Sequence, residues 1–205
     1  ATSPLHTLER ACDYAHLRGS RIYVTMNTII LPDELDSALD CARGAYLRGV
    51  DALIVQDVGL AALISRCIPD LRLHVSTQMN VHSSYGIEAA AALGAKRVTL
   101  ARELSLPEIN RLVVAAHELG LEVETFGHGA LCICYSGQCF MSSMIGGRSA
   151  NRGLCAQACR LPYKLIDSLD PDRELKSPGD FLLSPKDLCS IDHLDRLASL
   201  NVDSL

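Results

Sequence analysis

The chain has 205 residues, which is enough to build one domain with a substantial hydrophobic core. Hydrophobic residues make up 48% of it and aromatic residues 4%, which is typical of an α/β protein packed with aliphatic side chains. It has no run of about 18 uncharged apolar residues, so no membrane span is predicted, and its polar start predicts no signal peptide. The net charge of −5 argues against indiscriminate nucleic-acid binding, and we expect a cytoplasmic location.

Strand and helix periods alternate through the first two-thirds of the chain. The predicted strands are 21–27, 52–57, 73–78, 97–102 and 121–128, and the predicted helices between them are 33–49, 59–68, 82–94 and 105–120. Such strand–helix units imply parallel strands with right-handed crossovers. We therefore predict an α/β fold of the TIM-like (β/α) barrel type, with one domain over residues 1–205. An open doubly wound sheet would usually carry a glycine-rich phosphate loop, and no strand is followed by one.

Each predicted strand is apolar and becomes polar where it ends. The polar residues at these ends include Asn27, Asp57, Gln78, Glu103 and His128. Because the active sites of TIM barrels lie at the carboxyl ends of the strands, these side chains are candidates for a site. The alternative for each one is an ordinary polar group at a strand end.

The strand–helix rhythm breaks after residue 129. Residues 129–162 are rich in Gly, Ser and Cys and form a segment too long for an ordinary connection, which predicts a functional role. Beyond it we predict a short strand at 163–168 and a solvated turn at 169–180. Residues 181–200 read as a strand entering a helix, with Ser184 or Pro185 near the cap, and 201–205 as the start of a further strand.

Nine cysteines, an odd number, occur in a chain with no predicted secretory signal, which argues against a disulfide scaffold. Cys12, Cys41 and Cys67 are expected to be small buried hydrophobic residues. Four others follow the spacing C-x6-C-x15-C-x3-C, which can hold a zinc ion or an iron–sulfur cluster: Cys132, Cys139, Cys155 and Cys159. The loose, glycine-rich spacing favours a [4Fe–4S] cluster over zinc. Structural thiols and a cysteine nucleophile beside His128 stay open, and Cys134 is interpreted either as packing or as a neighbour of the ligands that does not itself bind.

The cysteine-rich segment is locally basic. No acidic residue lies between Glu124 and Asp167, whereas three arginines and a lysine do: Arg148, Arg152, Arg160 and Lys164. A cluster held by four thiolates is anionic, and Arg148 and Arg152 could offset that charge. The alternative is that these side chains are simply solvated.

Two stretches, ETFGHGALCICYSGQCFMSS (124–143) and GRSANRGLCAQACRLPY (147–163), closely resemble the signature of the peptidase U32, or collagenase-like protease, family. Shorter motifs recur in the family's order: VTMNTII (24–30), DALIVQDVG (51–59), HVSTQMNVH (74–82), VTLARELS (98–105) and LLSPKDL (182–188). The resemblance implies a TIM-like barrel, here incomplete, with its first strands and last strand missing and a cysteine-rich insertion after a late strand. It also implies a [4Fe–4S] cluster on the four spaced cysteines, with Cys189 as an alternative fourth ligand.

The family's activities are divided between peptidases and oxygen-insertion proteins that hydroxylate a tRNA wobble uridine, an rRNA cytidine or the ubiquinone ring. The segment 147–163 most resembles the RNA-hydroxylation branch, whose tRNA members imply prephenate as a cosubstrate, RNA as a partner and an electron donor. On this reading His128 is the proton donor or base, and Arg148 and Arg152 bind the cofactor. Substrate-binding residues would be Asn27, Asp57, Gln78, Glu103 and Arg160. The alternatives are a peptidase, although no G-x-S-x-G or H-E-x-x-H is present, and a non-catalytic iron–sulfur scaffold.

Overall fold

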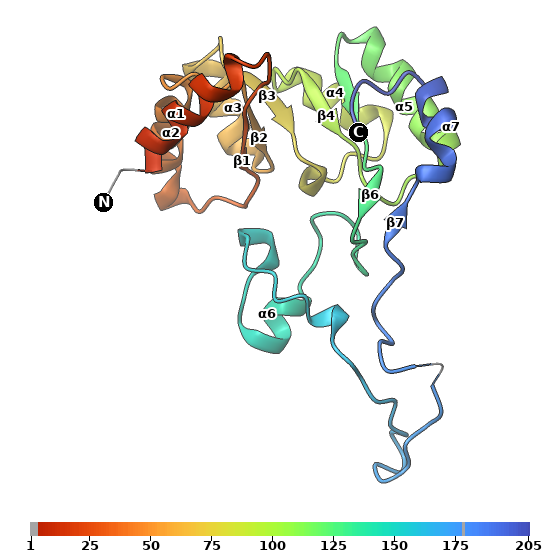
Figure 1. The fold of residues 1–205 in the computed structure, drawn as a ribbon. Coiled ribbons are helices and arrows are strands. Elements are labelled where there is room, and N and C mark those ends of the chain that lie inside the picture. The colour runs from red at the N-terminus through yellow and green to blue at the C-terminus, as the bar shows by residue number, and fades with distance from the viewer. Residues whose placement is uncertain (1–3, 178) are drawn as a thin grey trace.

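The computed structural model describes residues 4–177 and 179–205. Its centre is a five-stranded sheet in which every neighbouring pair of strands is parallel and the strand order follows the chain (Figure 1). The strands are β1 Tyr23–Met26, β2 Ala52–Val55, β3 Arg72–Val75, β4 Arg97–Thr99 and β5 Glu122–Glu124. The predicted α/β architecture with parallel strands is thus confirmed.

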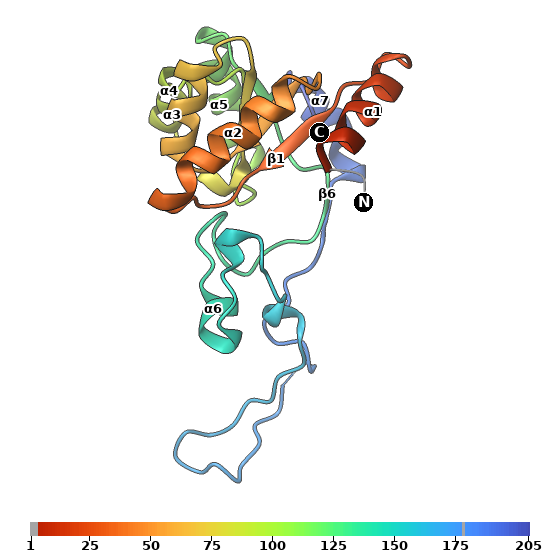
Figure 2. The same ribbon diagram turned by 90° about the vertical axis from the view of Figure 1, so that its left-hand side faces the viewer.

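Helices cover one face of this sheet (Figure 2). They are α1 Pro4–His16, α2 Leu35–Tyr46, α3 Val58–Cys67, α4 Ser84–Ala92 and α5 Leu106–Glu118. Every second residue of the strands points toward the helices and is apolar, so Leu53, Leu73 and Val98 are almost completely buried. Side chains also fix where helices begin: the Asp57 carboxylate accepts a hydrogen bond from the Leu60 amide at the start of α3.

The opposite face of the sheet is polar. Arg97 on β4 forms ion pairs with Glu122 (2.6 Å) and Glu124 (3.2 Å) on β5. His74 on β3 is 1% exposed, and its ring packs edge-on against Tyr23, with the centroids 4.8 Å apart. Burial, together with the neighbouring charges of Arg97 and Arg72, lowers the pKa of His74 to about 4. This imidazole is therefore neutral at physiological pH.

The rest of the chain leaves and re-enters the sheet domain through a short antiparallel ribbon (Figure 1). The ribbon pairs β6 His128–Gly129 with β7 Leu188–Cys189, and between them lies the cysteine-rich segment with α6 Met141–Gly146. After the ribbon, α7 Leu194–Ser199 leads to Ser204, which bridges in parallel to Glu124. A single bridge is not a strand, so the strand expected to begin at 201–205 stays a prediction. None of the described helices is long and apolar enough to cross a membrane.

Several sequence predictions are wrong in detail. Residues 163–168 form no strand but a single bridge between Ile166 and Glu174, within an exposed arm that projects from the domain (Figure 1). The helix predicted over 181–200 begins only at Leu194, after a 3-10 turn, so neither Ser184 nor Pro185 lies near its cap. The strand predicted over 121–128 is split between β5 and β6, which belong to different sheets.

The three cysteines predicted to be core residues differ from one another. Cys12 is 1% exposed and packs between α1 and α2, as predicted. Cys41 and Cys67 are exposed, which is opposite to the prediction. In α2 the buried positions are Ala38, Ala42 and Ala45, so the apolar stripe of that helix passes beside Cys41.

Candidate functional site

The cysteine-rich segment docks on the edge of the sheet where the parallel strands end. Ser136 is fully buried there, and both its amide and its hydroxyl donate to the carboxylate of Glu103, the hydroxyl at 3.1 Å. The Arg102 amide donates to the Ser136 hydroxyl oxygen at 3.3 Å. Because Arg102 and Glu103 lie in the connection that follows β4, this serine fixes the segment close to the carboxyl end of that strand.

A close backbone contact accompanies this anchor. Gly137 has φ of +73°, and a Cβ atom at this position would collide with the backbone carbonyl of Gln78. Only glycine combines a left-handed conformation with so close an approach. Gln78 and Glu103, predicted to bind substrate, thus both contact the anchored loop.

A second anchor lies at the other end of the sheet edge. Arg152 forms a two-pronged ion pair with Glu34 (2.6 and 2.8 Å) and donates to the Ile29 carbonyl at 3.0 Å. The Ile29 amide in turn donates to the Asn151 carbonyl. The hydrogen bonds from Arg152 and from the Leu31 amide lower the pKa of Glu34 to about 2. Arg152, which was predicted to offset the charge of a cofactor, is therefore already paired with Glu34.

Cys134 lies near three other thiols of the segment. Burial raises the pKa of the Cys134 thiol, and so do a hydrogen bond with Cys139 and the charges of Cys139, Cys132 and Cys159. Three predicted ligands thus affect Cys134, which the sequence assigned to packing or to a position beside the ligands that does not itself bind. The fourth, Cys155, has other neighbours: its sulfur accepts from the Gln157 amide at 3.4 Å and lies 4.0 Å from the Ser142 hydroxyl.

The donor set fits a thiolate-bound group in its chemistry. All nine cysteines are free, and five of them lie within residues 132–159, where no carboxylate is present. In the described part of the chain, no three His, Cys, Asp or Glu side chains are close enough to hold one metal ion. Zinc would need its thiolates within about 4 Å of one another, because each Zn–S bond is about 2.3 Å. An iron–sulfur cube separates its cysteine ligands more widely than a zinc ion does.

The remaining predicted residues occupy separate places. Arg160 donates to the Leu131 carbonyl (3.3 Å) and pairs with Asp187 at 2.9 Å. Arg148 is exposed, and its side chain makes no ion pair with any residue that the structure describes. Asp57 caps α3 and also accepts from the Ile30 amide at 3.1 Å, which is a structural role. Asn27 is half-buried just beyond β1.

His128 is exposed in β6, directly opposite Cys189 in β7. It lines an open cavity of about 770 Å³ together with Glu124, Thr125 and Cys189. Its role as proton donor or base stays a prediction. The alternative fourth ligand, Cys189, is exposed in the ribbon beside this cavity.

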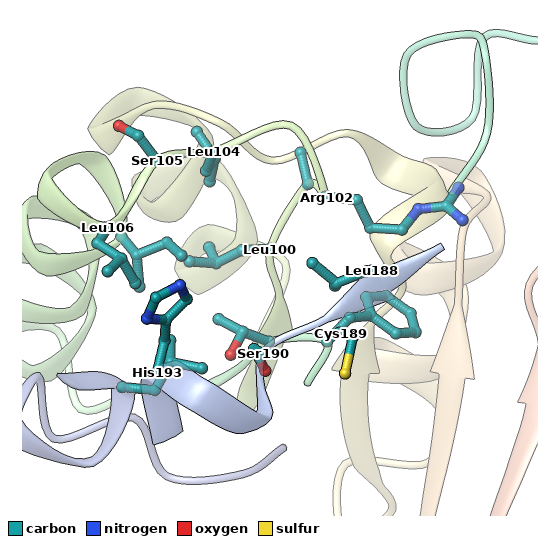
Figure 3. A pocket seen from close by; sticks show the side chains of 14 residues that line it. Leu100, Arg102, Leu104, Ser105, Leu106, Leu188, Cys189, Ser190 and His193 are labelled. Atoms are coloured by element: carbon teal, nitrogen blue, oxygen red, sulfur yellow. The ribbon is translucent and has the colours of Figure 1, made fainter. Parts of the chain in front are cut away.

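A second cavity, of about 270 Å³, adjoins the first and shares Thr125, Phe126 and Cys189 with it (Figure 3). It lies between the ends of β4 and β5, the start of α5, and β7 with the turn that follows. The sequence analysis missed it, because its far wall comes from residues 188–197. No periodicity places those residues against β4 and β5.

A family model described as peptidase family U32 matches residues 3–205. The chain is 42% identical over 204 residues to the 23S rRNA 5-hydroxycytidine C2501 synthase of Escherichia coli, covering 100% of this chain and 30% of that protein. It is 31% identical over 205 residues to tRNA hydroxylation protein P1 of Bacillus subtilis, covering 98% of this chain and 48% of that protein. This chain thus spans half or less of either relative's length.

Among solved structures, that of the U32 peptidase Mk0906 superposes with a TM-score of 0.50 at 22% sequence identity. The match covers 60% of this chain and 52% of that one. At this identity the similarity establishes a common fold and nothing about activity.

Proposed function

The chain belongs to peptidase family U32, and from this membership we propose that it is part of an iron–sulfur-dependent RNA hydroxylation protein. The observation that carries the proposal is its 42% identity, along its whole length, to an enzyme named for making 5-hydroxycytidine in 23S rRNA. We propose an rRNA cytidine or a tRNA wobble uridine as the substrate base. We also infer that the parallel sheet is part of a TIM-like barrel and that the protein acts in the cytoplasm.

The proposed cofactor is a [4Fe–4S] cluster on Cys132, Cys139, Cys155 and Cys159. Such a cluster supplies one-electron chemistry. The proximity of Cys134 to three of these thiols makes it a further candidate ligand. The chain's own contribution is to position the cysteine-rich segment, through Ser136 and Glu103, over the carboxyl ends of the strands.

We propose further that His128 donates or accepts the proton at the substrate, because it follows β5 and its side chain is exposed. Arg148 is the best candidate to contact a phosphate or an anionic cosubstrate such as prephenate, since its guanidinium is exposed. Contact of Arg160 with RNA would require its ion pair with Asp187 to open.

The test combines iron and sulfide analysis of the anaerobically purified full-length protein with mass spectrometry of RNA incubated with it. We expect about four irons and four sulfides per chain, and hydroxylated cytidine or uridine. Both should be lost in Cys132→Ser and Cys155→Ser but retained in Cys67→Ser, which removes an exposed thiol from α3. Cys134→Ser and Cys189→Ser identify which other thiol binds iron.

Three other outcomes would replace the proposal. A cluster without any RNA hydroxylation, even with a supplied reductant, would indicate a non-catalytic iron–sulfur scaffold. One zinc in place of iron would make the thiol site structural. Peptide cleavage in the absence of iron would favour the peptidase activity that the family name describes.

A further inference from the structure

Cys134 is a thiol that the proposed cluster does not need. A [4Fe–4S] cluster takes four cysteine ligands, and the spaced set already supplies four: Cys132, Cys139, Cys155 and Cys159. The thiol of Cys134 forms a hydrogen bond with Cys139, whereas Cys132 and Cys159 act on it only through their charges. Cys139 is therefore the thiol in direct contact with Cys134.

A tight turn brings these two cysteines together. Cys134 precedes and Cys139 follows a four-residue turn, which is closed by a hydrogen bond from the Gln138 amide to the Tyr135 carbonyl at 3.1 Å. Gly137 occupies the third position of the turn with φ of +73°, and a type II turn requires a positive φ there. A disulfide needs Cα atoms about 4.4–6.8 Å apart, a separation that residues flanking a closed turn reach with little backbone movement.

The sheet domain holds this turn in place. Ser136, inside the turn, donates to Glu103 and accepts from the Arg102 amide. Gly137 lies directly against the Gln78 carbonyl. Because these contacts do not involve the cysteines, they keep the two flanking thiols together in a chain without a cluster. Reacting groups held together in this way combine far faster than groups that must meet by diffusion.

The two thiols are also accessible. Both are free and only half-buried, so a small oxidant reaches them. The sulfur of Cys155 has different neighbours, since it accepts from the Gln157 amide at 3.4 Å and lies 4.0 Å from the Ser142 hydroxyl. The fold therefore favours one particular disulfide among the cysteines of the segment.

We propose that Cys134 and Cys139 form a reversible disulfide across this turn, with glutathione disulfide as the oxidant. One thiolate of the pair attacks glutathione disulfide and forms a mixed disulfide, which releases one glutathione. The other thiolate then attacks the protein sulfur of the mixed disulfide and releases the second glutathione. The two cysteines lose two electrons and two protons, and glutathione disulfide gains them. Closure also withdraws Cys139 from the ligands of the cluster, and this consequence alone rests on the proposed function.

The test uses the full chain, freed of metal and fully reduced, then equilibrated anaerobically with glutathione disulfide. Remaining thiols are alkylated, and the unfolded chain is digested with chymotrypsin and analysed by mass spectrometry. Chymotrypsin cleaves after Tyr135, between the two cysteines, so only a disulfide keeps their peptides together. We expect this linked peptide to exceed every other cysteine pair at least about tenfold, and to disappear when dithiothreitol is added.

Two serine variants form a matched pair. Cys134→Ser cannot close the disulfide, so Cys139 should remain as a mixed disulfide with glutathione. Cys132→Ser removes a different thiol that lies near Cys134, and it should keep the linked peptide. Mapping of the unchanged chain needs no variant, so the test still decides if a substitution impairs folding.

The cluster supplies a further comparison. A chain loaded with iron and sulfide should form several-fold less linked peptide, and Cys134→Ser should bind as much iron as the unchanged chain. Equal amounts of linked peptide in loaded and metal-free chains would refute the withdrawal of Cys139. A chain that binds no iron would refute the proposed cofactor, while the linked peptide would still decide the disulfide. The proposal is overturned if no linked peptide forms, or if Cys134→Ser loses iron, because Cys134 would then be a ligand.

Discussion

Gly137→Ala is the most informative single change, because it tests whether the cysteine-rich segment is held on the sheet by close backbone contact. An alanine at φ of +73° costs about 1–2 kcal/mol relative to glycine. Its Cβ would also overlap the Gln78 carbonyl, and overpacking of this kind adds about 1–3 kcal/mol because backbone atoms cannot rotate away. The docked loop should therefore lose about 2–5 kcal/mol.

Gly147→Ala is the matched control. Gly147 has φ of +64°, but a Cβ there would meet no atom within 4 Å. It should therefore show only the conformational cost of about 1–2 kcal/mol. The difference between the two variants, about 1–3 kcal/mol, isolates the close approach and corresponds to roughly a 5–150-fold change in the docking equilibrium.

Amide hydrogen exchange measures this equilibrium directly. The Ser136 amide donates to Glu103 and the Arg102 amide donates to Ser136, so both are protected only while the loop is docked. We expect both amides to exchange faster in Gly137→Ala than in Gly147→Ala by that factor. Equal protection of these amides in the two variants would refute the anchoring argument.

Three further predictions concern charged groups. Glu103→Gln should weaken docking of the loop by about 1–2 kcal/mol, seen as faster exchange of the Ser136 amide. Arg152→Gln should return the pKa of Glu34 from about 2 toward its ordinary 4.5, as measured by an NMR titration. Because the pKa of Glu34 is lower in the folded chain than in the unfolded chain, the contact with Arg152 stabilises the fold above pH 4.5. This stabilisation is lost as the pH falls toward 2. The pKa of His74 is likewise lowered, from 6.5 to about 4, so between these pH values the unfolded chain binds a proton that the folded chain does not, and the free energy of unfolding falls as the pH drops. In urea titrations His74→Phe should flatten this dependence of the free energy of unfolding on pH. An unchanged slope in the variant would contradict the prediction.

Periodicity was sufficient to predict the alternating strands and helices, and local signals such as the Asp57 cap or the Ser105–Glu108 capping box mark where some of the helices begin. It failed where structure depends on contacts between distant residues. The ribbon pairs His128 with Cys189, 61 positions apart by number, and neither strand exceeds two residues. Elements this short have no detectable period.

The candidate site shows the same division. Spacing singled out the cysteines, and three of the four predicted ligands lie near Cys134, but whether they bind a metal or cluster stays a prediction. It could not assign the roles of the strand-end residues, because Asp57 and Glu103 are occupied by partners that only the fold brings to them. The cavity at Arg102 and Thr125 was missed for the same reason, since five of its fourteen lining residues follow the long segment.

The charge of the cysteine-rich segment has to be judged from its partners rather than from its composition. Of its four cationic side chains, Arg152 pairs with Glu34, Arg160 with Asp187 and Lys164 with Glu174. Every one of these carboxylates lies outside the acid-free stretch between Glu124 and Asp167. The folded segment therefore presents far less positive charge than its sequence indicates. Electrostatic attraction of an RNA to it must rest on Arg148, or on opening pairs that now hold the segment and its arm in place.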